Sequence, residues 1–471
     1  MTSPEVDLPS TFDPEAGTNI KWKIPLGTEA HSSPVVSGGR VYIGTNNANP
    51  RDPKHQGDRG VLMCLDEESG QLQWQLIVPK RDEDPYFDWP RSGISSPATV
   101  EGDRVYIVTN RGEVVCLDAH GLSNGNQGPY QEEARHMTPK KQTALTLGPL
   151  DADILWLFDL TKEAGIWSHD GAHSSILIHG PHLYLNTGTG VDNTHRKIRT
   201  PDAPSLIVLD KSTGKFLGRE NEKNAVNIFH CTWSAPSLSQ VKGMPTLWFA
   251  GGDGILYGYD TLPFSHTPNS GPSELNRVWR FDFDPSAPKQ EVHRYHQNRR
   301  TGPSNFYGMP VIQGDEMYIA GGGDLWWGKT KAWLKCIRVS RDGDVLQDAL
   351  KWSFPLERHV MSTPAVTDKL IFIADCGKNL YCLNRSNGLE YWRHEAKGEF
   401  WASPYVADGK VFIGSRRGDF MIFKADPIKQ QLSTIDLGAP ISATTTAANG
   451  RMYVATMMDL YCLENGAENG N

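Results

Sequence analysis

The chain has 471 residues with 38% hydrophobic and 10% aromatic side chains, a formal net charge of −8 and a pI of about 6.0. This composition can build a large core, and it excludes nucleic-acid binding through a concentrated basic face. No apolar window of about 18 residues occurs, so we predict no transmembrane helix. The N-terminus lacks the apolar h-region of a signal peptide, so we expect either a cytoplasmic protein or a mature, exported form.

A short Ser-x-Pro pattern and its variants recur along the whole chain. The copies lie at residues 32–34, 95–97, 174–176, 234–236, 308–310, 362–364, 402–404 and 442–444. The last three end 40 residues apart, at positions 364, 404 and 444, which is about the length of one propeller blade. This repeat overrides the several domains that the chain length alone would suggest.

Each of the first seven copies is followed by four short apolar runs. In the first repeat a run after the Pro precedes RVYIGT at 40–45, VLMCLD at 61–66 and QLQWQL at 71–76. Large and small residues alternate in these runs, as is typical of buried strands. Five of the seven cysteines fall in the third run, so we interpret them as small buried strand residues and not as a disulfide framework. We predict an all-β, eight-bladed β-propeller of four-stranded blades.

The eighth repeat lacks its fourth run, since the chain ends soon after Glu464. Residues 19–26, NIKWKIPL, have the character of that run and precede the first Ser-x-Pro. We therefore predict that an N-terminal strand completes the last blade, because this pairs two otherwise exposed edges. The expected organisation is an extension at 1–17, a single propeller at 18–464 and a tail at 465–471.

The turn between the third and fourth runs has a recurring composition. It reads LDEESGQLQW at 65–74, LDKSTGK at 209–215 and LNRSNGLEYW at 383–392. Asp or Asn can accept backbone N–H groups of the turn, and Gly tolerates positive φ. The pattern resembles the tryptophan-docking motif of the pyrroloquinoline-quinone (PQQ) repeat family, over roughly residues 18–464. Gly218 stands near the Trp position of blade three, and blades four and seven lack such a turn.

The resemblance implies one of two functions. Quinoprotein dehydrogenases of this family hold PQQ and Ca²⁺ in the central funnel and oxidise alcohols or sugars, many of them with a vicinal Cys-Cys disulfide. This chain has no Cys-Cys pair, and Asp192, Asp324 and Asp375 are isolated in sequence. We interpret these three acids as acceptors at turns and strand ends.

The overall pattern is more similar to the non-enzymatic, exported branch of BamB-like proteins. We therefore expect a monomeric, non-catalytic binding or scaffold propeller, periplasmic or otherwise exported, that holds a protein or a carbohydrate-like ligand and needs neither PQQ nor Ca²⁺. A cytoplasmic protein and a PQQ-dependent oxidoreductase are the alternatives.

The residue three positions before each Pro position opens the first strand of a blade, and the register places these residues around one mouth of the channel. Two imidazoles and three aromatic rings among them predict a pocket for a planar or sugar-like ligand. The five are His31, His173, Trp233, Tyr307 and Trp401. The alternative is that these side chains only plug the channel.

Long insertions at 46–60, 77–92, 188–203, 282–304 and 321–332 are expected on the same face as that mouth. Their aromatic and basic residues predict a partner surface, because such residues are favoured in interfaces. The candidates are Tyr86, Trp89, Arg196, His293, Tyr295, Arg299, Trp326 and Trp327. Solvated loops are the alternative. The insertions 119–151 and 261–276 are expected on the opposite face, the first as a mobile excursion without a core.

Two groups of residues contain metal-ligating types at close spacing, namely His169 with Asp170 and His173, and His293 with His296. We interpret their segments as loops that enter strands and not as helices that would align the ligands, so we predict no metal site. No G-x-S-x-G, P-loop or HExxH motif occurs, so no catalytic residues are predicted.

Overall fold

The computed structural model describes residues 1–81, 87–171, 174–268, 270–344 and 347–467. The strands form eight sheets of four antiparallel strands, and two of these sheets carry a fifth, parallel strand. The middle strands of each sheet are buried on both faces, which explains their apolar composition. The predicted eight-bladed β-propeller is confirmed. The chain divides into unit 1 (Met1–Phe158 and Ala396–Asn471) and unit 2 (Asp159–Glu395).

Unit 1 contains four blades, the short helix α1 and the 3-10 helix η1. The blades are β2 (Val35–Ser37), β3 (Arg40–Asn46), β4 (Arg59–Asp66) and β5 (Leu72–Pro79); β6 (Thr99–Glu101), β7 (Arg104–Val108), β8 (Glu113–Asp118) and β9 (Ile154–Asp159); β28 (Tyr405–Ala407), β29 (Lys410–Gly414), β30 (Asp419–Lys424) and β31 (Gln431–Asp436); and β32 (Thr446–Ala448), β33 (Arg451–Ala455) and β34 (Asp459–Leu463) with β1 (Ile20–Pro25). The helices are η1 (Gly121–Asn124) and α1 (Glu133–His136).

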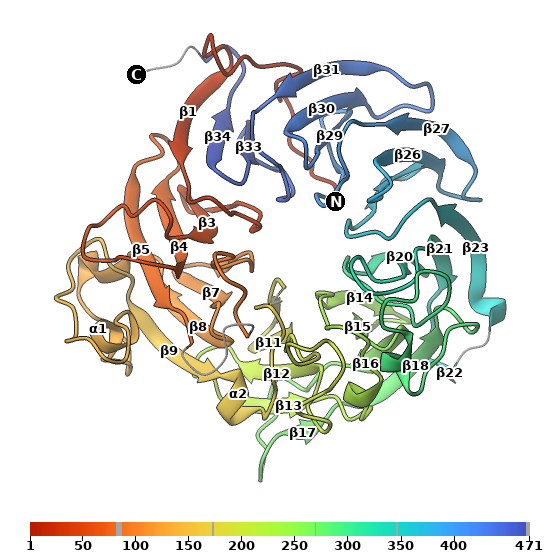
Figure 1. Ribbon diagram of the computed structural model, residues 1–471, viewed down its shortest axis with the longest axis horizontal. Coiled ribbons are helices and arrows are strands. Elements are labelled where there is room, and N and C mark those ends of the chain that lie inside the picture. The colour runs from red at the N-terminus through yellow and green to blue at the C-terminus, as the bar shows by residue number, and fades with distance from the viewer. Residues whose placement is uncertain (82–86, 172–173, 269, 345–346, 468–471) are drawn as a thin grey trace. The chain divides into compact units, whose positions relative to one another are not determined.

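The N-terminal strand β1 completes the blade that the C-terminal strands begin. It pairs antiparallel with β34, and Trp22 lies opposite Cys462. Figure 1 shows β1, in red, beside β34, in blue. The side chains of Ile20 and Trp22 are buried between neighbouring strands. The predicted pairing of the two ends of the chain in one sheet is therefore confirmed.

Tryptophans on the outer strands pack against the turn of a neighbouring blade. The Trp22 indole N–H donates to the carbonyl of Glu67 at 3.1 Å, and its ring faces Gly70. Gly70 has a φ of +71°, and a Cβ atom there would lie 2.8 Å from the Trp22 ring. Trp74 donates in the same way to Ala119 O (2.8 Å) and Trp352 to Arg385 O (3.2 Å). These contacts tie adjacent blades together.

The connection at 119–151 is attached to the core of unit 1. Met137 is fully buried in a cluster that includes Trp74. His136 lies 2.8 Å from the carboxylate of Glu113, and the Arg59 guanidinium donates to Met137 O at 3.0 Å. The expectation of a mobile excursion without a core was wrong, because single apolar residues dock it where the sequence shows no periodic pattern.

Unit 2 contains the other four blades. They are β10 (Leu177–His179), β11 (His182–Asn186), β12 (Leu206–Asp210) and β13 (Phe216–Arg219) with β17 (Ser273–Glu274); β14 (Ser237–Val241), β15 (Met244–Ala250), β16 (Ile255–Asp260) and β18 (Arg277–Asp282) with β22 (Gly343–Asp344); β19 (Val311–Gln313), β20 (Glu316–Gly322), β21 (Ala332–Arg338) and β23 (Leu350–Leu356); and β24 (Ala365–Val366), β25 (Leu370–Ala374), β26 (Asn379–Asn384) and β27 (Glu390–Glu395). The helices are α2 (Leu160–Glu163), η2 (Ala225–Asn227), η3 (Val292–Tyr295) and η4 (Gln347–Ala349).

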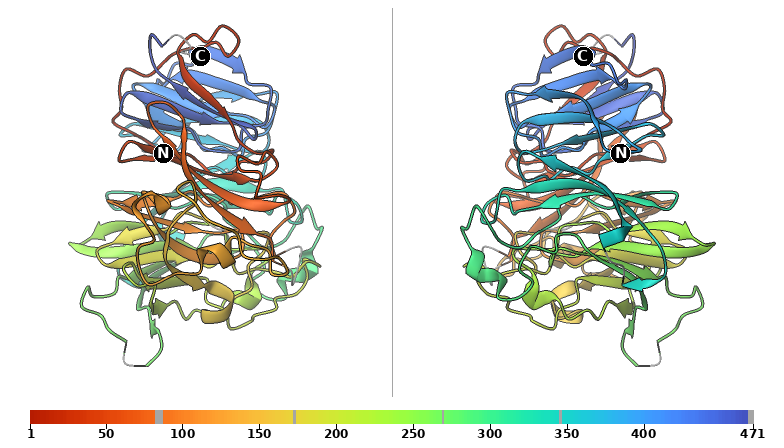
Figure 2. Two further views of the ribbon diagram at one scale, coloured as in Figure 1. Left: turned by 90° about the vertical axis from the view of Figure 1, so that its left-hand side faces the viewer. Right: turned by 90° about the vertical axis from the view of Figure 1, so that its right-hand side faces the viewer.

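The connection at 261–276 in unit 2 supplies the extra strand β17, which pairs in parallel with β13. Leu262 and Phe264 of this connection pack against β11 and β10, and a green loop extends away from the strands of its unit in both side views (Figure 2). All seven cysteines are buried, and five of them lie on β4, β8, β21, β26 and β34, as their repeated context predicts. Within the described residues, no helix has the length and apolar character to cross a membrane.

Candidate functional site

Three loop segments of unit 2 are joined by backbone hydrogen bonds next to the first strands of blades three and four. The His169 N–H donates to Gly188 O at 3.1 Å, and the Val191 N–H donates to His230 O at 2.9 Å. At Gly190, a Cβ atom would lie 2.5 Å from His230 O, so only glycine permits this approach. The long connection between β11 and β12 is therefore fixed against both strand-entering segments.

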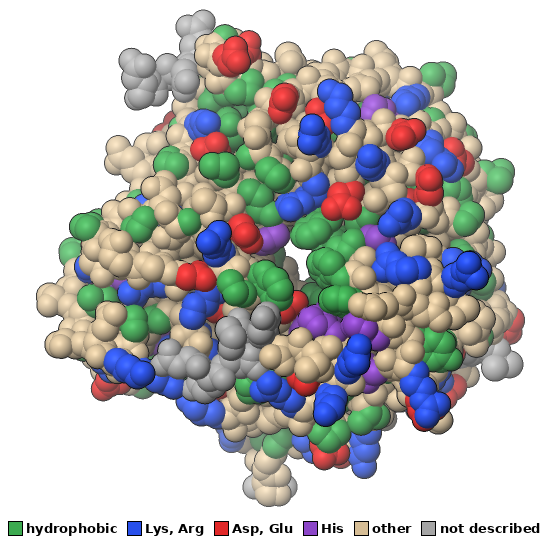
Figure 3. Space-filling model, viewed as in Figure 1, with side chains coloured by type: hydrophobic (Ala, Val, Ile, Leu, Met, Phe, Trp, Pro, Cys, Tyr) green, Lys and Arg blue, Asp and Glu red, His purple; other side chains and the backbone are tan. Residues whose placement is uncertain are grey.

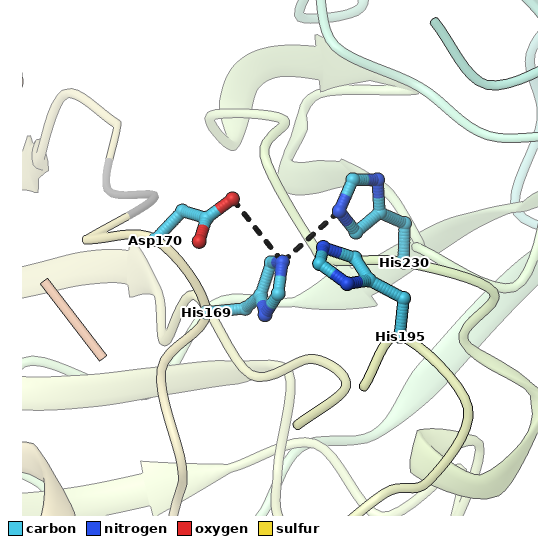
Figure 4. Close-up of side chains that lie close together, drawn as sticks. All are labelled: His169, Asp170, His195 and His230. Carbon is cyan, nitrogen blue, oxygen red and sulfur yellow. Dashed lines mark hydrogen bonds and ion pairs between the residues drawn. The ribbon is translucent and has the colours of Figure 1, made fainter. Parts of the chain in front are cut away.

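This junction brings together His169, Asp170, His195 and His230, whose ligand-type atoms all lie within 4.8 Å of one another (Figure 4). The Nε2 atoms of His169 and His230 are 3.0 Å apart. Asp170 Oδ2 is 3.2 Å from His169 Nε2. The His195 ring centroid lies 4.8 Å from that of His169 and 5.1 Å from that of His230. In the described part of the chain, no other three or more His, Cys, Asp and Glu residues gather in this way.

The outer nitrogens of two of these imidazoles have polar partners. His169 Nδ1 lies 2.8 Å from Val191 O, and His230 Nδ1 lies 2.8 Å from Asp324 Oδ2. Asp324 is fully buried and also accepts from the hydroxyl of Tyr307 at 2.8 Å. Burial alone would raise the pKa of Asp324, but His230 and the N–H and O–H donors outweigh it and hold this pKa well below its usual range. Asp324 is therefore a buried anion that orients His230.

The other two members of the group are half-buried. Burial lowers the pKa of His195 to about 4, and the neighbouring His169 and His230 add to this effect. The pKa of Asp170 is lowered. Burial alone would raise this pKa, but the hydrogen bond and charge of His169 outweigh burial. At neutral pH the His195 imidazole is thus neutral and the Asp170 carboxylate is ionised.

Aromatic side chains surround the histidines. Trp233 stacks on Tyr307 with ring centroids 4.5 Å apart, and His230 meets the Trp233 ring edge-on at 4.8 Å. Trp327 contacts His195 at 4.9 Å, and Trp326 lies 5.6 Å from His230. Figure 3 shows histidine side chains gathered on the viewed face with hydrophobic and basic side chains nearby. Trp326 keeps 45% of its surface exposed.

Two of the predicted partner loops of unit 2, 282–304 and 321–332, are joined. The Gln297 N–H donates to Trp327 O at 2.8 Å, and the Thr330 N–H donates to Arg299 O at 3.2 Å. The Arg299 guanidinium in turn donates to Leu325 O at 3.4 Å. These two joined loops carry five of the predicted partner residues, namely His293, Tyr295, Arg299, Trp326 and Trp327. Arg196 is exposed on the adjoining β11–β12 connection.

Comparison with known proteins identifies the repeats. The sequence model of the family described as outer membrane protein assembly factor BamB matches residues 58–122 and 338–427. Within these two segments the repeats are similar to those of that family. The resemblance to PQQ-repeat, BamB-like propellers that the sequence predicted is therefore confirmed. A search of curated proteins finds no match to the chain.

Solved structures share the fold of this propeller at low sequence identity. BamB from Moraxella catarrhalis is 12% identical, with a TM-score of 0.54, over 95% of this chain and 98% of that one. Chaetomium thermophilum Sqt1, bound to the N-terminus of the ribosomal protein L10, is 10% identical, with a TM-score of 0.53, over 95% and 98%. The computationally designed Ika8 protein is 9% identical, with a TM-score of 0.51, over 93% and 98%. These similarities concern the fold alone.

Four of the five predicted channel-mouth residues form two pairs. In unit 1, His31 stacks on Trp401 with centroids 6.1 Å apart, and in unit 2 Trp233 stacks on Tyr307. His173 lies outside the described residues. Among the partner candidates, Tyr86 also lies outside them, and Trp89 is on the surface of unit 1 with 45% of its area exposed.

The acids considered for Ca²⁺ do not fit a calcium site. Asp375 accepts from the backbone N–H groups of Glu357 and Gly377 at 2.9 Å and from the Tyr381 hydroxyl at 2.9 Å. Asp192 accepts a hydrogen bond from the Thr194 hydroxyl of its own loop at 2.6 Å. Asp324 is already hydrogen-bonded to His230. A Ca²⁺ ion needs six to eight oxygen ligands, whereas these oxygens serve separate turns.

The sequence spacing of His169 and Asp170 suggests His173 as their neighbour. In the structure their partners are His195 and His230. The sequence does hold one indication that His169 and His230 are close. Each lies in the connection that leads into the first strand of its blade, and the two blades are consecutive. His195 reaches them only through the pairing of loop backbones, which has no period in the sequence.

Proposed function

We propose that this protein is a non-catalytic binding propeller, and that a protein partner docks on the aromatic surface of unit 2 formed by Trp233, Tyr307, Trp326, Trp327 and Arg299. The observation that carries the proposal is the exposure of Trp326 on loops that are already fixed by hydrogen bonds. A preorganised indole costs little conformational entropy on binding, and Trp and Arg dominate interface hot spots.

The matched family is described as an assembly factor, and Sqt1, which shares the fold, is bound to a ribosomal-protein segment. Both comparisons support a protein partner. A carbohydrate-like ligand is less well supported. A sugar needs a free ring face on which to stack, whereas Trp233 and Tyr307 cover each other at 4.5 Å.

We propose that the protein does not bind PQQ. The quinoproteins of this family hold PQQ together with Ca²⁺, and the candidate acids of this chain do not fit Ca²⁺. The test is to add PQQ and Ca²⁺ to the purified protein, remove excess ligand and record the absorbance spectrum and dye reduction with alcohols or sugars. We expect no stoichiometric quinone signal. A one-to-one quinone signal with substrate-dependent dye reduction would establish the oxidoreductase alternative instead.

We also propose that the protein is exported to the periplasm, as the BamB-like family implies. Expression of the full gene product in its source cells, followed by separation of the compartments, tests this proposal. Recovery in the periplasmic or envelope fraction is expected. Recovery with cytoplasmic markers alone would place the protein in the cytoplasm and restrict its partner to that compartment.

The partner surface is tested by affinity capture from source cells with the native chain, followed by binding measurements with the purified partner. Trp326→Ala is expected to weaken binding on the order of 30-fold, the effect of a hot spot of about 2 kcal/mol. The matched control is Ile428→Ala, since Ile428 is an apolar side chain of unit 1 that is 78% exposed. Equal affinity for the native and Trp326→Ala proteins would contradict the proposed surface.

A further inference from the structure

We propose that His169, His195, His230 and Asp170 bind a divalent transition-metal ion of the Zn²⁺ class. The four residues come from three loops of unit 2, and their ligand-type atoms lie within 4.8 Å of one another (Figure 4). This inference stands on the geometry of the group alone and does not depend on the proposed protein partner.

The first argument is the orientation of two imidazoles. His169 Nδ1 faces a carbonyl oxygen and His230 Nδ1 faces a buried carboxylate, and both partners can only accept a hydrogen bond. With a proton on each Nδ1, the two Nε2 atoms face each other across 3.0 Å. Two lone pairs at this distance would repel each other, so the contact requires a cation, either a proton shared by the two nitrogens or a metal ion bound by both.

The second argument is that two distances between the ligand atoms are close to those around a tetrahedral metal ion. Two nitrogens bound to one tetrahedral Zn²⁺ at about 2.05 Å lie roughly 3.3 Å apart. The His169–His230 nitrogen pair at 3.0 Å and the His169–Asp170 pair at 3.2 Å are close to this value. Two of the separations that one ion requires are therefore already present, and the remaining ligand-type atoms lie within 4.8 Å.

The third argument is an oxygen without a partner. Asp170 Oδ1 is buried and has no hydrogen-bond partner among the described residues. Asp170 and His195 also have φ angles of +54° and +58°, in the left-handed region that few residues with a side chain adopt. Backbone held in this region at a convergence of ligand-type side chains is typical of functional sites.

The hydrogen-bond partners of the outer ring nitrogens are also those found around metal sites. A ligating histidine commonly donates its second N–H to a carboxylate or a carbonyl, and His230–Asp324 and His169–Val191 supply one of each. The outer partners fix the rings before any ion binds. Loops 166–171, 187–205 and 228–234 are further joined by backbone hydrogen bonds, so the group is preorganised.

The donor set determines the class of ion. Three imidazoles and one carboxylate suit Zn²⁺ and its transition-metal neighbours, whereas Ca²⁺ and Mg²⁺ prefer oxygen ligands alone. The nearby Cys231 is not a ligand, because its thiol faces the carbonyl of Gly188 at 3.3 Å and burial holds its pKa well above the usual range. The ion would link the β11–β12 connection, through His195, to the two strand-entering segments.

The test uses the full chain, stripped with a chelator and titrated with Zn²⁺ alone at pH 7.5 by calorimetry, with metal analysis after buffer exchange. We expect one equivalent of tightly bound Zn²⁺ per chain and a rise in melting temperature when Zn²⁺ is added. His195→Ala is expected to weaken binding on the order of 100-fold or more. His195 is half-buried, so this variant should fold, which its melting without metal will check.

The matched control is His179→Gln, which removes a half-buried histidine of the same unit whose ring packs on Phe264. This variant should bind one equivalent of Zn²⁺ with native affinity. Equal Zn²⁺ affinity of the native and His195→Ala proteins would overturn the proposal. The absence of stoichiometric binding by the native chain would also overturn it, and would assign the short His169–His230 contact to a shared proton.

Discussion

Gly70 shows how one residue serves both a turn and a contact between blades. Its φ of +71° disfavours any residue with a side chain, and its Cα faces the ring of Trp22. Gly39 has a φ of +72° but no atom within 4 Å of its hypothetical Cβ. Gly70→Ala should therefore lower the free energy of unfolding by about 1–3 kcal/mol more than Gly39→Ala, because only the former displaces Trp22. Urea unfolding of both variants measures this difference, and equal losses would contradict the steric role of Trp22.

His359 makes the stability of unit 2 depend on pH. It is 2% exposed, and neither ring nitrogen has a hydrogen-bond partner among the described residues. Burial, with smaller contributions from Arg358 and Arg299, lowers the pKa of His359 from 6.5 to about 4. Between these values the unfolded chain binds a proton that the folded chain does not, so stability is complete above pH 6.5 and falls as the pH decreases.

The contribution of His359 is measured by comparing the native protein with the His359→Gln variant. From pH 7.5 to pH 5.0 the native protein should lose about 1–2 kcal/mol more unfolding free energy than His359→Gln, which cannot take up this proton. Denaturant titrations at the two pH values measure the loss. Parallel pH dependence of the two proteins would show that His359 is protonated equally in the folded and unfolded states.

At the scale of strands and loops, the repeat predicted the blades well, because each strand carries its own alternating pattern. The N-terminal strand could be placed in the last blade for the same reason, since one run was missing there. The connections were predicted poorly. Met137, Tyr130 and Leu147 pack the segment 119–151 against the core, but their spacing follows no period. His195 is brought to His230 by hydrogen bonds between loop backbones, so neither contact has a signature in the sequence.

The strand β1 provides a test at this scale. Residues 1–17 also contribute buried side chains, Leu8 and Phe12, so two truncations are needed to isolate β1. Removal of residues 1–27 should lower the melting temperature far more than removal of residues 1–17, because only the longer deletion exposes the edge of β34. Calorimetry measures both variants. Similar melting of the two would contradict a structural role for β1.

For the whole molecule, the repeats explain the scaffold, whereas the evidence for function lies in the connections of unit 2. The central claim is that a protein partner docks where Trp326 is exposed. The prediction that residues 18–464 form one domain stays a prediction, and it does not affect this claim, because every residue of the proposed surface belongs to unit 2.

The most direct measurement is site-specific photo-crosslinking in source cells, with a photoreactive phenylalanine analogue at position 326 or, as the control, at position 428. Both positions are exposed, at 45% and 78%, and they lie in different units. The account predicts one discrete crosslinked protein from position 326 and none of that protein from position 428. No crosslinked protein at position 326, or the same product from both positions, would contradict it.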